Sequence, residues 1–500
     1  MDIFANLALG FSTALSWANL FYCFVGVVLG TLIGVLPGLG PVATIAMLLP
    51  ITFAFQPVTA LIMLAGIFYG AQYGGSTTAI LVNLPGEASS VITALDGHAM
   101  AKRGEAGKAL AIAAIGSFIA GTIATFLIAL FAPPLSAMAM KFGPAEYFSL
   151  LVLGLIISIV LARGSLLHAL GMIFLGLFLG IIGTDVNSGA TRFTFDMPDL
   201  ADGIGFVVLA MGIYGTGEIV GNLEKKETRD LLMKNVTGLR LSWKELKKIM
   251  PSILRGTTVG SFLGILPGGG AVLSSFAAYA VEKKFAKSAI PFGEGAPEGV
   301  AGPESANNAG SQTSFIPMLT MGIPSNPTMA IMIGALMIHS IQPGPSMINE
   351  QPALFWGLIA SMWIGNLFLI VLNLPMIGLW VKLITAPYHL LYPMILVFCA
   401  IGVISINNTE FDVYLMALFG FIGYIFNKLD CEPAPMLLAF ILGPMMEEYL
   451  RRALLMSSGD FTVFVTRPLS ATLLAISVVA LVVVLLPAIS QKREETFKEE

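Results

Sequence analysis

Charged residues are scarce in this sequence. They make up 11% of its 500 residues, whereas hydrophobic residues make up 56% and the mean hydropathy is +0.86. Since an average soluble domain carries about a quarter charged residues, a soluble fold of this size would need more polar surface than the chain supplies. Long apolar blocks joined by short polar links predict membrane spans instead.

Cysteine and histidine are also rare, which argues against several chemistries. The three cysteines, Cys23, Cys399 and Cys431, fit no metal-ligand spacing and no disulfide framework. The four histidines form no paired metal motif, and the sequence has neither a nucleotide-binding glycine motif nor a nucleophile elbow. We therefore expect no metal site, no cofactor, no ATP-driven pump and no enzyme. The net charge of −4 gives no indication of a basic surface for nucleic-acid binding.

Apolar runs of roughly 17–25 residues predict an all-α polytopic membrane protein embedded in a lipid bilayer. Uninterrupted candidate spans lie at 58–81, 109–131, 146–162, 165–183, 203–221, 353–376, 388–405, 412–426 and 469–487. Proline and glycine interrupt four further apolar regions, at 18–55, 251–281, 305–342 and 434–447. These four predict broken helices or re-entrant hairpins, and bring the expected total to about ten to thirteen crossings.

Lysine and arginine predict the orientation in the membrane. The loop 222–255 contains nine of them, so we expect it in the cytoplasm. The basic segments 102–108 and 283–287 fall on the same side by span count, whereas loops 133–145 and 184–202, with one basic residue each, fall outside. We divide the chain into a first transmembrane repeat at 1–221, a charged cytoplasmic linker at 222–250, a second repeat at 251–487 and a polar tail at 488–500.

An internal repeat relates the two halves. Residues 26–42 (GVVLGTLIGVLPGLGPV) and 256–272 (GTTVGSFLGILPGGGAV) are identical at eight of 17 positions, at an offset of 230. Glycines spaced by four line one face of a helix, where they permit close helix packing. A weaker echo at offset 235 pairs Gly75-Ser76 and Thr78 with Gly310-Ser311 and Thr313.

The Pro-Gly-x-Gly that ends each glycine ladder predicts a helix break, because proline removes a donor and glycine permits unusual dihedrals. Paired breaks in two halves are typical of a transporter binding site. Half-helix N-termini favour an anion there, and unwound carbonyls can hold a cation. By the charge argument the two hairpins start on opposite sides, so we predict inverted repeats. The expected helix-breaking residues are Pro37, Pro267 and Pro324, and the expected binding glycines are Gly38, Gly40, Gly268, Gly269 and Gly270.

Two polar stretches, 69–90 and 294–328, lie between apolar segments and supply further candidates. Hydroxyl and carboxamide groups can bind a carboxylate without burial of a matching charge. The candidate substrate or ion contacts are Ser76, Thr77, Thr78, Asn83, Asn307, Asn308, Ser311 and Thr313. Each of these could equally cap a broken helix or pack between spans. Glu298 and Glu304 are candidate proton or cation ligands at membrane depth, and ordinary solvated charges in a loop.

Several motifs resemble the large membrane subunit of the bacterial tripartite tricarboxylate transporters. They are GVLPGLGP at 34–41, YGGSTTAILVNLPGE at 73–87, LDGHAMAKRGEAGKAL at 95–110, GILPGGGA at 264–271, LGPMMEEYLRRAL at 442–454 and the long stretch 296–336. The resemblance covers nearly the whole chain. It implies import of tricarboxylates such as citrate, or of related carboxylates, driven by a sodium or proton gradient across the bacterial inner membrane. It also implies two partners, a small membrane subunit and a periplasmic solute-binding protein.

Three other functions remain as alternatives. An ion or solute channel would show flux that does not saturate, although paired broken helices favour alternating access over a pore. A secondary transporter for a different small anion would keep the same architecture. A structural scaffold for other subunits would tolerate substitutions at the Pro-Gly breaks.

Overall fold

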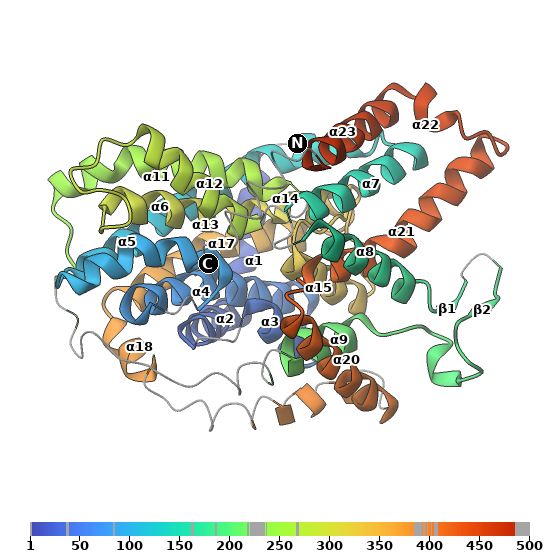
Figure 1. Ribbon diagram of the computed structural model, residues 1–500, viewed down its shortest axis with the longest axis horizontal. Coiled ribbons are helices and arrows are strands. Elements are labelled where there is room, and N and C mark those ends of the chain that lie inside the picture. Colours follow the sequence, from blue (N-terminus) through green and yellow to red (C-terminus); the bar gives the residue numbers. More distant parts are fainter. Residues whose placement is uncertain are drawn as a thin grey trace.

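The computed structural model of the chain is almost wholly helical, as predicted (Figure 1). It describes residues 3–36, 40–83, 86–161, 165–185, 188–217, 238–266, 270–384 and 409–485, with isolated positions between them. The strands among these residues, β1 (Gly183–Thr184) and β2 (Thr191–Arg192), pair into one short antiparallel hairpin. The predicted span 388–405 and the tail 488–500 lie mostly or wholly outside the described residues, as does most of the linker before 238.

Most helices coincide with predicted spans, but two bounds differ. The helix that begins at Ala106 continues through Pro133 and Pro134 to Ala139, so the predicted loop 133–145 is partly helical. In the predicted span 203–221 a short α-helix is followed by a π-helix at Met211–Gly217. The helices of the first half are α1 (Ile3–Ala14), α2 (Trp17–Val35), α3 (Pro41–Thr52), α4 (Pro57–Val82), α5 (Val91–Lys102), α6 (Ala106–Ala139), α7 (Pro144–Leu161), α8 (Leu166–Gly180) and α9 (Phe206–Ala210). Those of the second half are α11 (Trp243–Ile265), α12 (Gly270–Phe285), α13 (Pro297–Thr313), α14 (Phe315–Met321), α15 (Pro327–Ile338), α16 (Met347–Glu350), α17 (Pro352–Asn373), α18 (Ile377–Ile384), α20 (Phe411–Lys428), α21 (Ala434–Met456), α22 (Val463–Thr466) and α23 (Pro468–Leu485).

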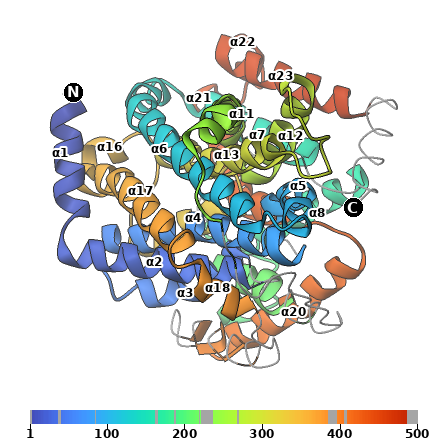
Figure 2. The ribbon, with the colours of Figure 1, turned by 90° about the vertical axis from the view of Figure 1, so that its left-hand side faces the viewer.

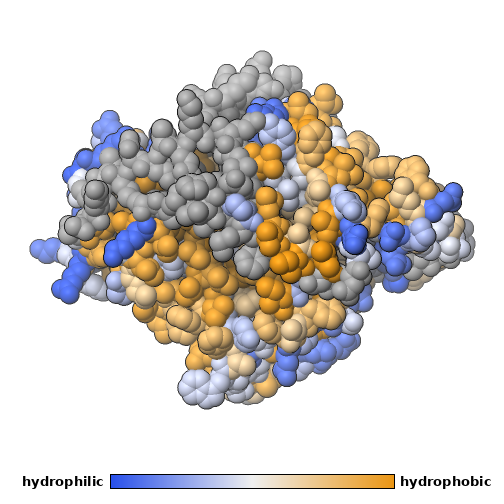
Figure 3. All heavy atoms as spheres, turned by 90° about the horizontal axis from the view of Figure 1, so that it is seen from below, coloured by the Kyte–Doolittle hydropathy of each residue, from blue (hydrophilic) through white to orange (hydrophobic). Residues whose placement is uncertain are grey.

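Five described helices are long and apolar enough to cross a membrane: α2, α4, α6, α17 and α20. Shorter apolar helices, among them α7, α8 and α15, accompany them. Large hydrophobic side chains such as Trp17, Leu167 and Val479 lie on the surface, and hydrophobic residues gather across the middle of the face in Figure 3. The protein is therefore a multi-pass helical membrane protein, whereas the number of crossings and the inversion of the repeats remain predictions.

The glycine ladders pack the two halves in the same way. A Cβ atom on Gly30 would lie 2.3 Å from the carbonyl oxygen of Ile67 in α4, and one on Gly260 would lie 2.2 Å from that of Ala306 in α13. Such close approach of two helix backbones is possible only without a side chain. The other ladder contacts follow the same pattern: Gly26 with Met63, Gly34 with Ala71, Gly256 with Gly302, and Gly264 with Gly310.

These contacts correct the weaker sequence echo. The ladder glycines are offset by 230 residues, but their partners in α4 and α13 differ by 239 in all three pairs. The echo at offset 235 therefore does not align structurally equivalent residues, since a difference of four residues is a shift of about 6 Å along a helix. Small polar residues recur in both α4 and α13, so a comparison of the sequences alone paired them at the wrong offset.

Helix breaks occur at most of the predicted places. α2 and α3 are separate helices, as are α11 and α12, and the residues between them include Pro37–Leu39 and 267–269, which lie outside the described part of the chain. Pro324 lies in the non-helical link between α14 and α15, where Gly322 has φ +72°. The break predicted at 434–447 was wrong, because α21 continues through Pro444 as one helix.

The described parts of the basic segments, at the end of α5 and the start of α11, lie together at one end of the molecule (left in Figure 1). Lys108 at the start of α6 pairs with Glu245 at the start of α11 at 2.7 Å. Lys108 and the Ser242 N-cap lower the pKa of the Glu245 carboxyl to about 2, so this link between the halves stays charged at neutral pH. The β1–β2 hairpin lies at the opposite end (right in Figure 1), and the side of the membrane that each end faces stays a prediction.

Candidate functional site

Helix α13 lies at the centre of the molecule, although its sequence is polar. Residues Glu298–Thr313 are all buried, and the helix packs against α4, α5, α6, α11 and α12 (Figure 2). Buried helices are normally apolar all round, and buried polar groups need hydrogen-bond partners. The polar side chains of α13 must therefore find their partners inside the protein or in a bound solute.

Asp96 in α5 fixes the N-terminus of α13. Its Oδ1 accepts hydrogen bonds from the backbone N–H groups of Gly293, Gly295 and Ala296 at 2.7–2.9 Å, and its Oδ2 accepts one from the Tyr279 hydroxyl at 2.9 Å. A carboxylate at this position also interacts favourably with the helix dipole. The LDGH segment of the first half therefore positions the polar helix of the second half.

Replacement of Asp96 by asparagine is expected to loosen the loop 286–296. The amide oxygen keeps one acceptor but loses the charge that holds three N–H groups, and a hydrogen bond to a charged group contributes about 1.5–3 kcal/mol. Limited proteolysis should then cut this loop several-fold faster than in the wild type. Asp202→Asn, at an exposed position in the opposite loop, is the matched control. Equal cleavage rates in Asp96→Asn and wild type would contradict the anchoring role.

Four candidate residues share one face of α13. At 100° per residue, Glu304, Asn307, Asn308 and Ser311 form a stripe about 100° wide. The stripe faces α4, α5 and α6: Ser76 donates to Glu304 Oε2 at 2.6 Å, and Asn308 donates to the Ser117 hydroxyl at 2.6 Å. The structure thus brings residues of the two predicted repeats together.

Glu304 places a carboxyl group in the middle of this polar cluster. Its side chain is fully buried, and both carboxylate oxygens accept hydroxyl hydrogen bonds, one from Ser76 and one from Thr93 in α5. Within the described part of the chain, the ion pairs formed by lysine and arginine do not include it. A buried acidic residue without a basic partner is a candidate for ion or proton binding.

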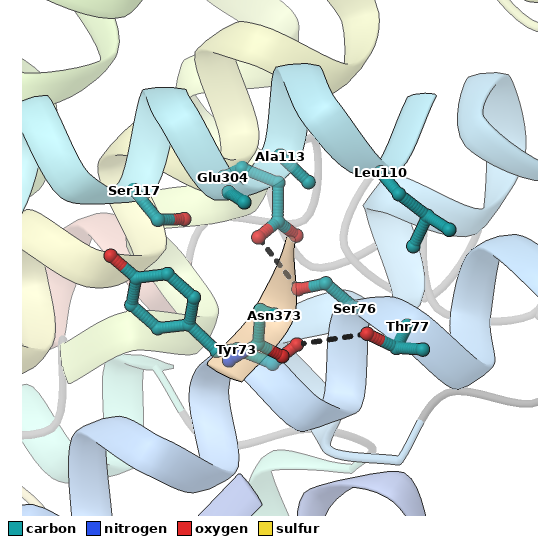
Figure 4. Close-up of a pocket in the computed structure, with 9 residues that line it drawn as sticks. Tyr73, Ser76, Thr77, Leu110, Ala113, Ser117, Glu304 and Asn373 are labelled. Carbon is teal, nitrogen blue, oxygen red and sulfur yellow. Dashed lines mark hydrogen bonds between the residues drawn. The ribbon is translucent and has the colours of Figure 1, made fainter. Parts of the chain in front are cut away.

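A small pocket opens beside Glu304 (Figure 4). It encloses about 240 Å³ of empty space, open solvent included, and has room for about one water-sized molecule. Its lining residues are Tyr73, Ser76, Thr77, Leu110, Ala113, Ala114, Ser117, Glu304 and Asn373. In this conformation the pocket can hold an ion but not a tricarboxylate.

Several buried polar atoms near the stripe have no hydrogen-bond partner. Neither the amide nitrogen nor the amide oxygen of the Asn307 side chain has one, and Gln312 Oε1 and Asn373 Oδ1 also lack one. Asn307 and Asn373 are nearly inaccessible, at 0% and 3% exposure. Since native proteins leave few such groups unsatisfied, these atoms are suited to bind a solute or water.

Glu298 differs from Glu304, although sequence reasoning grouped them. It accepts a hydrogen bond from Ser288 at 2.7 Å and pairs with Lys248 at 3.5 Å, near the basic end of the molecule. It lies in the first turn of α13, where an acidic residue interacts favourably with the helix dipole. Of the two glutamates, Glu304 is therefore the one that lacks a countercharge.

Of the other candidates, Thr77 belongs to the pocket, whereas Thr78, Thr313 and Asn83 occupy structural positions. Thr78 donates to the Gly34 carbonyl oxygen at 3.3 Å, at the end of α2. Thr313 packs against Gly264, while Thr77 lines the pocket. Asn83 ends α4 in the left-handed conformation, with φ 56° and an exposed side chain; asparagine is common at such helix ends.

The expected binding glycines are only partly visible. Pro37, Gly38, Pro267, Gly268 and Gly269 lie outside the described residues. Gly40 is the N-cap of α3, and Gly270 begins α12 with φ +51°, next to the side chain of Asn326. Both helix N-termini thus follow directly on the predicted breaks.

Sequence reasoning missed five residues around Glu304: Tyr73, Glu87, Thr93, Ser117 and Asn373. Tyr73 and Glu87 lie within the polar stretch 69–90 but were not named as candidates, and Glu87 has one buried carboxylate oxygen without a partner. Thr93, Ser117 and Asn373 lie in other helices, with no local pattern to mark them. Their role depends on contacts across long sequence separations, such as that between Thr93 and Glu304.

The fold and this site define a class of protein. A multi-pass helical membrane protein, with a polar site buried among broken helices, has the arrangement of a membrane transporter. The profile of the tripartite tricarboxylate transporter TctA family matches residues 20–438. The chain belongs to this family, and is thus a subunit of the tripartite transporter type.

Two relatives from Agrobacterium vitis are similar to the chain. An uncharacterized 52.8 kDa protein in the TAR-I ttuC' 3' region is 59% identical over 500 residues, covering all of both chains. An uncharacterized protein in the TAR-II ttuC' 3' region is 58% identical over 241 residues, which is 48% of this chain and all of that one. No solved structure is significantly similar.

Proposed function

We propose that this protein is the membrane permease subunit of a binding-protein-dependent secondary transporter in the bacterial inner membrane. It imports tricarboxylates such as citrate, or related carboxylates, by alternating access coupled to a sodium or proton gradient. The observation that carries the proposal is α13, a polar helix buried at the centre of a membrane protein of the TctA family. The polar side chains of a buried helix need hydrogen-bond partners, and a bound solute can supply them.

The α13 stripe offers donors suited to a carboxylate. Asn307 has a free amide group. Asn308 is the next residue, and Ser311 lies one turn beyond Asn307 on the same face. A carboxylate accepts hydrogen bonds from amides and hydroxyls, which together stabilise its charge without a buried lysine or arginine. The N-terminus of α12 at Gly270, which lies beside Gly310 of α13, adds a favourable dipole.

Alternating access would use the two ladder-packed units, α2–α4 and α11–α13. Each unit is held rigid by close backbone contacts. The stripe on α13 faces α4 of the other unit, so a movement of one unit against the other would open and close the site. The pocket beside Glu304 is narrow, as expected of an occluded conformation.

The partners follow from the family. A small membrane subunit would cover part of the exposed apolar surface, and a periplasmic solute-binding protein would deliver substrate at the end that carries loop 184–202. The first alternative, a channel, would need neither a gradient nor a saturable site.

Uptake by cells that express the chain with its neighbouring subunits tests the proposal. Labelled citrate and a panel of other carboxylates are supplied with and without a sodium gradient, and at two external pH values. We expect saturable, gradient-dependent uptake of at least one carboxylate. Asn308→Ala and Ser311→Ala should raise the apparent KM about tenfold, since each removes about 1.5 kcal/mol of hydrogen bonding to a charged group.

Thr320→Ala is the matched control, because Thr320 is also a buried hydroxyl that donates within its own helix, at 2.8 Å to the Ile316 carbonyl oxygen. It should leave the KM unchanged. Absence of uptake for every carboxylate, with the complex folded and assembled, would refute the substrate assignment.

A further inference from the structure

We propose that the pocket beside Glu304 binds one sodium ion. The ligands are the Glu304 carboxylate, the Asn373 amide oxygen, and hydroxyls drawn from Ser76, Thr77 and Ser117. The site itself stands on geometry, and its role as the coupling-ion site rests on the proposed function.

Charge is the first argument. The Glu304 carboxylate is fully buried, and no lysine or arginine among the described residues pairs with it. An unpaired buried charge destabilises a protein by several kcal/mol. Hydroxyls of Ser76 and Thr93 reduce this penalty but carry no charge. A bound cation would neutralise the site.

The chemistry of the lining is the second argument. The polar side-chain atoms offered to the pocket are oxygens: a carboxylate, three aliphatic hydroxyls, the Tyr73 hydroxyl and an amide oxygen. The Tyr73 hydroxyl already donates to Asn366 at 2.7 Å, which leaves its lone pairs free. Oxygen-only sites select hard cations over soft metals, and they repel an anionic substrate.

Asn373, the last residue of α17, is oriented with its amide oxygen free. Its Nδ2 donates to the Leu369 carbonyl oxygen at 2.9 Å, so its Oδ1 is the free end. That atom has no hydrogen-bond partner, and the residue is 3% exposed. A cation between Glu304 and Asn373 would neutralise the carboxylate and give Asn373 Oδ1 a partner.

Size and charge point to a monovalent ion. The pocket has room for about one water-sized molecule, which a dehydrated sodium ion can occupy. Among the described residues, no three His, Cys, Asp or Glu side chains come together as a metal site. A calcium ion takes six to eight oxygen ligands and usually several carboxylates, so a single carboxylate with neutral oxygens suits a monovalent ion better.

The position of the site has a consequence for transport. Its ligands come from α4 and α6 of the first half and from α13 and α17 of the second. A cation bound there would keep all its ligands only while these four helices of the two halves stay packed together. It would also bring a positive charge next to the α13 stripe, which favours an anionic substrate.

Sodium binding to the purified transporter complex tests this inference without any substrate. Thermal unfolding is followed at constant ionic strength, with NaCl replaced by KCl or choline chloride, at pH 7 and pH 8. We expect saturable stabilisation by sodium and not by choline. Asn373→Leu and Ser76→Ala should raise the sodium midpoint at least about tenfold, and Glu304→Gln should abolish the sodium response. Glu298→Gln is the matched carboxylate control and should keep the wild-type midpoint.

Two outcomes would overturn the site. One is a wild-type complex with no sodium-specific stabilisation. The other is a sodium response that Asn373→Leu, Ser76→Ala and Glu304→Gln all leave unchanged in folded, monodisperse protein. Stabilisation that depends on pH alone, and is insensitive to Asn373→Leu, would assign a proton to Glu304 instead. Because no carboxylate is present, failure of the uptake experiment would refute the proposed function and leave this result standing.

Discussion

Glu304→Gln is expected to reduce carboxylate uptake about 100-fold or more while the protein still inserts and assembles. Glutamine keeps the shape, and its oxygen can accept a hydrogen bond from one of Ser76 and Thr93 while its amide group donates to the other hydroxyl. It cannot carry the charge on which ion binding depends. Removal of one partner of a buried ionic contact typically destabilises that contact by about 3–5 kcal/mol, and each 1.36 kcal/mol is a factor of ten.

The matched control for this prediction is Glu298→Gln. Glu298 is a buried glutamate of the same helix, but it pairs with Lys248 near the basic end. Its loss should change uptake less than about fivefold, because partly exposed pairs contribute little. Initial uptake rates, normalised to the amount of assembled protein, measure both. Equal effects of the two variants would contradict the separate role given to Glu304.

Gly30→Ala and Gly260→Ala are expected to prevent correct folding of the protein. In each case the new Cβ would lie 2.2–2.3 Å from a backbone carbonyl oxygen of the facing helix. A flexible side chain could move aside, but here the whole backbone of α4 or α13 must shift. Overpacking of a core usually destabilises by about 1–3 kcal/mol, and a helix-wide shift should exceed that range.

Gly171→Ala in α8 controls for the effect of the substitution alone, since nothing lies within 4 Å of its added Cβ. The measurement is the yield of monodisperse protein in detergent, together with its thermal unfolding temperature. The ladder variants should lose most of the folded protein, whereas Gly171→Ala should match the wild type. Normal yield and stability of both ladder variants would mean that α2–α4 and α11–α13 are not packed as described.

Much of the architecture could be predicted because it depends on local patterns. Apolar runs located the helices, and glycines at spacing four identified the faces that meet α4 and α13. Proline placed the break between α14 and α15 correctly at Pro324. The same reasoning failed at Pro444, since a helix can continue through a proline and the sequence does not show how the freed backbone group is satisfied.

The site could be predicted only in part. Polar residues in an apolar context singled out Glu304, Asn307 and Ser311, all of which the structure buries in α13. Their partners could not be found, because Ser117 and Asn373 are ordinary residues in apolar helices until the fold brings them to Glu304. Thr78 and Asn83 show the converse. A polar residue beside a helix end can stabilise the backbone there, and the sequence does not distinguish this role from binding a solute.

The most direct test of the account is transport by the purified complex in proteoliposomes. The solute-binding protein, loaded with a labelled carboxylate, is added outside vesicles that contain the membrane subunits, with an inward sodium gradient, an inward proton gradient or neither. We expect saturable accumulation above the external concentration that requires a gradient and is lost in Glu304→Gln. Flux that merely equilibrates, persists without a gradient and does not saturate would contradict it and indicate a channel.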